Sequence, residues 1–246
     1  MYKLLFFILL ACALYNGWRE NKISLFFHSL TDSRLWMLLL LSFSLIPLDL
    51  FVSVARAKGF WSYVSKLGNT MGDADIVMPI VLFLFCLSVA LKLDYLRDFL
   101  LELICIVVLI LVLGNLFKMG FGRARPYMGL GEFSFFNFPD SIFKNGFQSF
   151  PSGHMFFATS LFGWIGMRLG GWMKLLSLII IAIVAYNRLE THNHFFSDVA
   201  FSVALGYILL ISYSREVKMA EKASSFSPLV SLSFFKRVFL GGKQGL

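Results

Sequence analysis

Long apolar runs are the feature that most limits how this chain can fold. A helix needs about 20 mostly apolar residues to cross roughly 30 Å of hydrocarbon. Of the 246 residues, 58% are hydrophobic and only 15% are charged, which leaves more apolar surface than a soluble monomer could bury. The sequence therefore predicts an all-α polytopic membrane protein. We expect a six-transmembrane helical bundle with spans at approximately 35–55, 76–92, 99–117, 154–170, 172–187 and 196–213.

The apolar runs divide the chain into three regions. Residues 35–213 hold the expected spans and, with no internal repeat, form one domain. Residues 1–34 form a hydrophobic N-terminal segment, whose first run, 4–15, is short for a span. This run is either a signal-peptide core with a small-residue cleavage site at 11–13 or an uncleaved interfacial helix, which the single basic residue before it favours. Residues 214–246 form a basic cytoplasmic tail.

The excess of basic residues indicates on which side of the membrane each loop lies. Lys and Arg number 22 against 14 Asp and Glu, a net charge of +8. In a polar chain this balance would suggest nucleic acid, but here it suggests the basic flanks of membrane helices, so we expect no nucleic-acid partner. With the N-terminus inside, 14 basic residues fall on the inner side and eight on the outer side, together with the large loop 118–153. In a bacterium this predicts a multi-pass inner-membrane protein with that loop on the periplasmic face.

Polar residues of unusual kind collect at three points along the chain. They follow the third expected span, open the fourth, and join the fifth to the sixth. Connections after odd-numbered spans emerge on the same side of the membrane, so all three clusters can converge on one site. Taken alone, each has a simpler interpretation, as an interfacial anchor, a helix cap or a loop network. The clusters are Lys118-x6-Arg125-Pro126, Pro151-Ser152-Gly153-His154 and Arg188-x5-His194-x3-Asp198.

The residue types in these clusters indicate an anionic ligand. Lys118, Arg125 and Arg188 are three cations without enough carboxylates to neutralise them, and guanidinium groups suit phosphate oxygens. Ser152 and Gly153 precede an apolar run, as at a helix start, where free N–H groups attract anions. Ser152 either caps this helix or donates to the ligand. The clusters therefore predict a phosphate-binding site.

Two histidines supply the groups that phosphoryl transfer requires. His194 and Asp198 are four residues apart, so in a helical segment the carboxylate can orient the imidazole, which makes His194 the expected nucleophile. His154, at another helix start, is the expected general acid. We expect no metal and no other cofactor, because the sequence has no carboxylate cluster of the two-metal kind and its three cysteines lie in apolar runs. Asp49, inside the first expected span, is expected to be structural.

Together the three clusters resemble the signature of the type 2 phosphatidic acid phosphatase (PAP2) superfamily, whose motifs are Lys-x6-Arg-Pro, Pro-Ser-Gly-His and Ser-Arg-x5-His-x3-Asp. The resemblance implies a helical bundle of PAP2 type over 35–213 and a phosphoric ester hydrolase. It implies that phosphate is bound by Lys118, Arg125, Ser152, Gly153 and Arg188. It also implies that the catalytic residues are His194, His154 and Asp198.

Three positions near the motifs leave alternatives open. Asn187 stands where the motif has serine, which keeps a hydrogen-bonding group but alters that contact. Arg123 either contacts phosphate or faces lipid headgroups. His192, two residues before His194, is interpreted as a peripheral or substrate-side group.

The large loop indicates the class of substrate. Aromatic residues at headgroup depth favour a loop that rests on the bilayer or lines a cleft for acyl or prenyl chains, with packing inside the loop as the alternative. We therefore expect a membrane lipid phosphate as substrate. The resemblance to bacterial PAP2 members implies a set of such lipids, among which the outward-facing site and the Phe-rich loop favour lipid A with a 1-phosphate. The alternatives are an undecaprenyl pyrophosphate or phosphatidylglycerophosphate phosphatase, a lipid phosphotransferase, and, least favoured, a non-enzymatic lipid-binding protein. The loop holds Phe133, Phe135, Phe136, Phe138, Phe143, Phe147 and Phe150.

Overall fold

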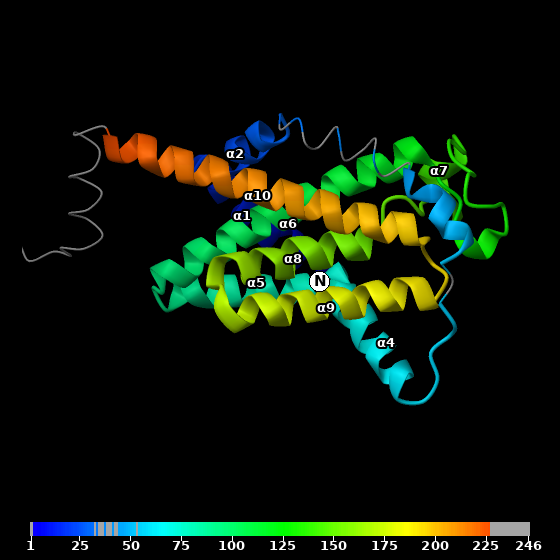
Figure 1. Ribbon diagram of the computed structural model, residues 1–246. Helices are drawn as coiled ribbons and strands as arrows, with labels where there is room; N and C mark the ends of the chain where they lie inside the picture. Colours follow the sequence, from blue (N-terminus) through cyan, green and yellow to red (C-terminus); the bar gives the residue numbers. More distant parts are fainter. Residues whose placement is uncertain are drawn as a thin grey trace, which may run out of the picture.

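The chain folds into helices, in agreement with the expected all-α class. The computed structural model describes residues 2–226 except 32, 34–36, 38–40, 42–43 and 53, and these described residues contain no strand. Helices α6, α8, α9 and α10 run side by side, and α4 lies obliquely at one end of them (Figure 1). The elements are α1 (Tyr2–Arg19), α2 (Lys22–Ser29), the 3-10 helix η1 (Ile46–Leu50), α4 (Phe60–Gly72), α5 (Ala74–Ala90), α6 (Asp94–Phe121), η2 (Pro126–Met128), α7 (Asp140–Phe143), η3 (Asn145–Phe147), α8 (Gly153–Leu169), α9 (Gly171–Glu190) and α10 (Phe196–Phe226).

Three stretches of the described chain are long and apolar enough to cross a membrane. They are Asp94–Met128, which contains α6, Gly171–Glu190, which is α9, and Phe196–Lys218 within α10. A fourth arises if α4 and α5, which meet at a bend of 56°, form one broken span. The described residues therefore do not confirm the expected count of six. The first expected span, 35–55, lies partly outside them, and its described end forms η1 and non-helical chain.

The fourth expected span is α8, which occupies the centre of the bundle. It is 17 residues long, packs against α6, α9 and α10, and buries most of its side chains. Glycines on its neighbours permit close packing: a Cβ at Gly114 of α6 would lie 2.7 Å from Phe156 Cδ2, and one at Gly206 of α10 would lie 2.8 Å from Thr159 Cγ2. Because protein surrounds α8, this helix needs no continuous lipid-facing surface.

The short helix α4 has no counterpart among the expected spans. Its inner face carries the small buried residues Ser65 and Gly68 and packs against α9, while Phe60 and Tyr63 are largely exposed on its other faces. The helices approach so closely that a Cβ at Gly68 would lie 2.5 Å from the carbonyl oxygen of Ile183. Exposed aromatic residues on one side and small polar residues on the other are typical of a helix at the membrane interface.

The first and last helices of the described residues pack with the rest of the bundle. Helices α1 and α2 contact α6, and α2 also contacts α10. Ala13 and Phe26 are buried in the main hydrophobic core, so the N-terminal segment contributes to that core. Helix α10 continues to Phe226, so the first part of the expected tail, 214–246, extends a helix of the bundle and the remainder lies outside the described residues.

The contact between α4 and α9 provides a test of the fold. Replacing Gly68 by alanine would press a methyl group against the backbone of α9, which cannot move aside as a flexible side chain would. We expect a loss of stability of about 1–3 kcal/mol, measured as a lower Tm of the protein in detergent. Gly120→Ala is the matched control, because a Cβ at that helical glycine would meet nothing within 4 Å. An unchanged Tm for Gly68→Ala would contradict this packing.

Candidate active site

The three polar clusters lie together at one end of the bundle. Lys118 is in the last turn of α6, Gly153 opens α8, and Arg188 is in the last turn of α9. His194 lies in the short connection after α9, and Asp198 is in the first turn of α10. Because α6 and α9 end where α8 and α10 begin, the structure brings the clusters together, as the alternation of spans predicts (Figure 1).

The loop between α6 and α8 folds back so that its two ends are neighbours. Helix α6 ends at Phe121 and is followed by Gly122, whose φ of 49° lies in the left-handed region that glycine adopts readily. The N–H of Ser149 then donates to the carbonyl of Arg123 at 3.0 Å, and the N–H of Arg125 donates to the carbonyl of Gly146 at 2.8 Å. These backbone bonds hold the residues just before α8 beside those just after α6.

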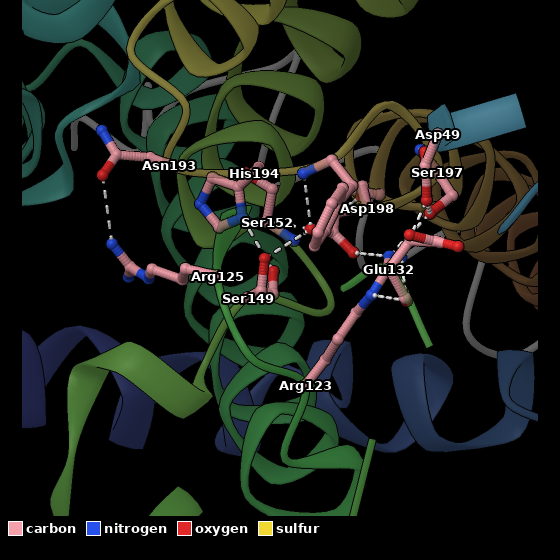
Figure 2. Close-up of polar contacts among 12 residues, drawn as sticks. Asp49, Arg123, Arg125, Glu132, Ser149, Ser152, Asn193, His194, Ser197 and Asp198 are labelled. Carbon is pink, nitrogen blue, oxygen red and sulfur yellow. Dashed lines mark hydrogen bonds and ion pairs between the residues drawn. The ribbon is translucent and has the colours of Figure 1, made fainter. Parts of the chain in front are cut away.

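His194 is oriented mainly by a backbone carbonyl. Its Nδ1 lies 2.7 Å from the carbonyl oxygen of Ser149 and 3.7 Å from Oδ2 of Asp198 (Figure 2). Since a carbonyl only accepts hydrogen bonds, Nδ1 carries the hydrogen, and in the neutral ring Nε2 keeps a free lone pair. Burial lowers the pKa of His194 to about 4, against the opposing effect of the Asp198 carboxylate, and the nearby cations Arg125 and Lys118 lower it further. The imidazole is therefore neutral near pH 7.

Asp198 is held by donors on three sides and is fully buried. It accepts from the hydroxyl of Ser149 at 2.6 Å, from the N–H of Phe195 at 2.9 Å, and from Arg123 Nη1 at 2.6 Å. The bond to Phe195 reaches back over the first turn and satisfies an N–H group at the start of α10. Asp198 thus caps the start of α10 and provides a negative charge close to His194. The direct hydrogen bond to the His194 ring comes from the Ser149 carbonyl.

Arg123 lies behind His194 and Asp198, on the inner side of the site. Its side chain is 0% exposed, pairs with Asp198, and donates through Nη2 to Asp49 Oδ2 at 2.8 Å and through Nε to the Glu132 carbonyl at 3.0 Å (Figure 2). The guanidinium carbon sits 4.1 Å from the centre of the Phe195 ring. The structure therefore places Arg123 away from lipid headgroups and gives it carboxylates as its charged partners.

Asp49 completes this buried network. Besides pairing with Arg123, it accepts from the N–H of Ser197 at 2.8 Å and from the Ser197 hydroxyl at 2.6 Å. These bonds tie η1 to the first turn of α10, which agrees with the structural role expected for Asp49.

Buried donors without partners mark the place for an anion. Among the described residues, Arg125 Nε and the Ser152 hydroxyl are buried and make no hydrogen bond. Ser152 does not cap α8, so of the two roles expected for it, donation to a ligand is the one left open. Lys118 lies against the same helix start, because a Cβ at Gly153 would be 2.7 Å from its Nζ. A buried unpaired donor is costly, and an oxyanion in this position would satisfy these groups.

Arg188 is held by amide side chains. Its Nε donates to Asn187 Oδ1 at 2.8 Å, and its Nη2 donates to Asn69 Oδ1 of α4. Asn187 in turn donates to the Ser65 hydroxyl at 2.7 Å. Asparagine at this position therefore provides a contact of its own, which links Arg188 to α4.

His154 completes the expected set. It lies against the C-terminal end of α4, since a Cβ at Gly72 would be 3.2 Å from His154 Cδ2. Arg188 and His194 are close enough to act on it electrostatically. Within the described part of the chain, no group of three or more His, Cys, Asp or Glu side chains could hold a metal ion.

Sequence reasoning did not identify Asn69 and Ser149 as members of the site. Asn69 lies on α4, far from the three motifs, and an uncharged amide on an unforeseen helix gives no signal. Ser149 acts partly through its backbone carbonyl, which no residue type encodes. Its place just before the Pro151–His154 motif puts it near the site, but the motif itself does not include it.

The buried ion pairs of Arg123 predict a large effect on stability. In Arg123→Met, Asp49 and Asp198 would keep their burial but lose their cation, and breaking a buried pair in this way costs about 3–5 kcal/mol. We expect a strongly lowered Tm or failure to fold. Arg97→Met is the control, because Arg97 pairs with Asp94 and Asp98 at an exposed site, where such pairs contribute about 0–1 kcal/mol. Equal Tm values for the two variants would contradict the importance of the buried network.

Comparison with protein families is consistent with this geometry. The model of the PAP2 superfamily matches residues 99–221, which is half of the chain. No curated protein and no solved structure matches the chain. Because the matched residues run from α6 into α10 and include all three polar clusters, the chain belongs to the PAP2 superfamily.

Proposed function

We propose that this protein removes a phosphate group from a membrane lipid through a phosphohistidine intermediate. The observation that carries the proposal is the setting of His194. Its ring is buried and neutral, the Ser149 carbonyl occupies Nδ1, and Nε2 is left as the nucleophilic nitrogen. Arg125, with its unpaired Nε, and Lys118 lie close enough to bind the phosphate that Nε2 would attack.

The reaction takes place in two steps. In the first, Nε2 of His194 attacks phosphorus, the phosphorus–oxygen bond to the lipid breaks, and His154 donates a proton to the leaving oxygen. In the second, His154 takes a proton from water, whose oxygen attacks phosphorus and breaks the phosphorus–nitrogen bond. Inorganic phosphate leaves and His194 returns to its neutral form. Lys118, Arg125, Ser152, Gly153 and Arg188 bind the phosphoryl oxygens in both steps, and Asp198 stabilises the charge on His194.

Exposed aromatic residues in the large loop support a lipid substrate. Phe133, Phe136, Phe138 and Phe143 are all well exposed, the last of them 80% exposed, whereas Phe150 is buried in the core. Packing in the protein interior, the alternative explanation for these phenylalanines, therefore holds for Phe150 but not for the four exposed rings. Four exposed rings in the one loop that joins α6 to α8 suit insertion among lipid chains.

Lipid A with a 1-phosphate is the substrate we favour. In this proposal the site opens to the periplasm at the surface of a bacterial inner membrane, and the distribution of basic residues supports that orientation of the large loop. Phosphate esters of lipids on that face are within reach of a site at the helix ends.

The proposed mechanism is tested by phosphate release from a panel of purified lipid phosphates. We expect the wild-type protein to release phosphate in EDTA, and His194→Ala to lose at least about 10³-fold in kcat, as for the loss of a catalytic nucleophile. His192→Ala is the matched control, since this half-buried neighbour is outside the proposed chemistry. Activity retained in His194→Ala would exclude the phosphohistidine, and activity lost in EDTA would exclude metal independence.

A second test concerns the exposed rings of the loop. Changing Phe133, Phe136, Phe138 and Phe143 together to serine should raise the KM for lipid roughly ten-fold, the effect of losing about 1.4 kcal/mol. Hydrolysis of water-soluble p-nitrophenyl phosphate should stay unchanged. Tyr95→Ser is the control, because this exposed aromatic residue lies at the opposite end of α6. Equal losses on lipid and soluble ester would show that the rings serve the fold and do not bind lipid.

A further inference from the structure

A polar groove lies between α4 and α9, beside the three clusters. It has a volume of about 510 Å³. The α4 residues that line it follow Ser62 at intervals of three, four, seven and eight positions, so they share one face of that helix. The side chains that form its walls include Ser62, Lys66, Asn69, Thr70, Glu190 and Thr191.

The groove adjoins the proposed phosphate site. Asn69 and Asn187 both line it, and both accept hydrogen bonds from the guanidinium group of Arg188. A phosphoryl group bound by Arg188 would therefore be separated from the groove only by the side chains of Asn69 and Asn187. A substituent attached to that phosphate could extend directly between the two helices.

Several polar groups in the groove are available to a ligand. Ser62 Oγ and Lys66 Nζ make no hydrogen bond or ion pair with the described residues, and Thr70 Oγ1 donates only to the Lys66 carbonyl of its own helix, at 3.1 Å. The carboxylate of Glu190 is already engaged by the N–H of Ala57 and the Ser65 hydroxyl. The groups open to a ligand are thus the Ser62 hydroxyl, the Lys66 ammonium and, as an acceptor only, the Thr70 hydroxyl oxygen.

We propose that this groove binds the hydroxyl-rich part of the headgroup, the sugar or polyol that carries the phosphate ester. Hydroxyl and amide groups match the donors and acceptors of a polyol. A second phosphate would need more than the single cation Lys66, and an acyl chain would need walls of aliphatic or aromatic side chains, whereas hydroxyl, amide and charged side chains line this groove. The inference rests on the proposed function, because it assigns the headgroup that the same site would select.

Two substrates and two sets of variants test the groove. Lipid A carries its phosphate on a sugar with free hydroxyl groups, whereas dioleoyl phosphatidate carries it on a glycerol whose other two hydroxyls are esterified. We expect Ser62→Ala/Thr70→Val to lower kcat/KM for lipid A about ten-fold, as for two lost hydrogen bonds, and to leave phosphatidate within two-fold. Lys66→Met should act in the same direction. Lys174→Met, at the far end of α9, is the control and should change neither.

A binding measurement separates the groove from the catalytic proposal. Calorimetric titration of the His194→Ala protein should show tighter binding of glucosamine 1-phosphate than of inorganic phosphate, and Ser62→Ala/Thr70→Val should remove the difference. Equal affinities, or equal losses on both lipids, would overturn the headgroup assignment. If the wild type hydrolyses no lipid while the preference for sugar phosphate remains, the groove is supported and the proposed hydrolysis fails.

Discussion

The buried charge of Arg123 is the interaction on which the site depends most. A guanidinium group cannot be moved away from water without compensating charge. Asp49 and Asp198 provide that charge from η1 and from α10, and the Glu132 carbonyl and the Ser197 hydroxyl accept further hydrogen bonds. One side chain thereby fixes three segments that are far apart in the sequence. The orientation of the first turn of α10, and with it the surroundings of His194, follows from this contact.

The same pairing explains why the front of the site is cationic. Asp198 is the carboxylate nearest to His194, but its charge is already matched by Arg123. Lys118 and Arg125 consequently face a space in which no described carboxylate is free to neutralise them. An anion that enters from outside is what restores the balance. The structure thus separates two groups of charges: the carboxylates and Arg123 neutralise one another, whereas Lys118 and Arg125 would be neutralised by an anionic ligand.

The sequence predicted the helical class and the grouping of the three motifs, because apolar runs and alternating crossings are properties of residue order alone. It did not predict α4, since a short helix with small residues on one side and exposed aromatics on the other has neither the length nor the uniform hydropathy of a span. The sequence also did not predict the partners of Arg123. Spacing along the chain places Lys118 and Arg125 near His194, but only tertiary packing decides that Arg123, between them, turns inward to Asp49.

The contact between Nδ1 of His194 and the Ser149 carbonyl has a consequence for how this site can change. A peptide group is present whatever residue occupies position 149, so point substitutions leave this acceptor in place. Ordinary mutational drift could remove the Ser149 hydroxyl or the Asp198 carboxylate, but the tautomer of the ring would still be set by the main chain. The most persistent element of the site is therefore one that comparison of side chains among descendants of this sequence would never reveal.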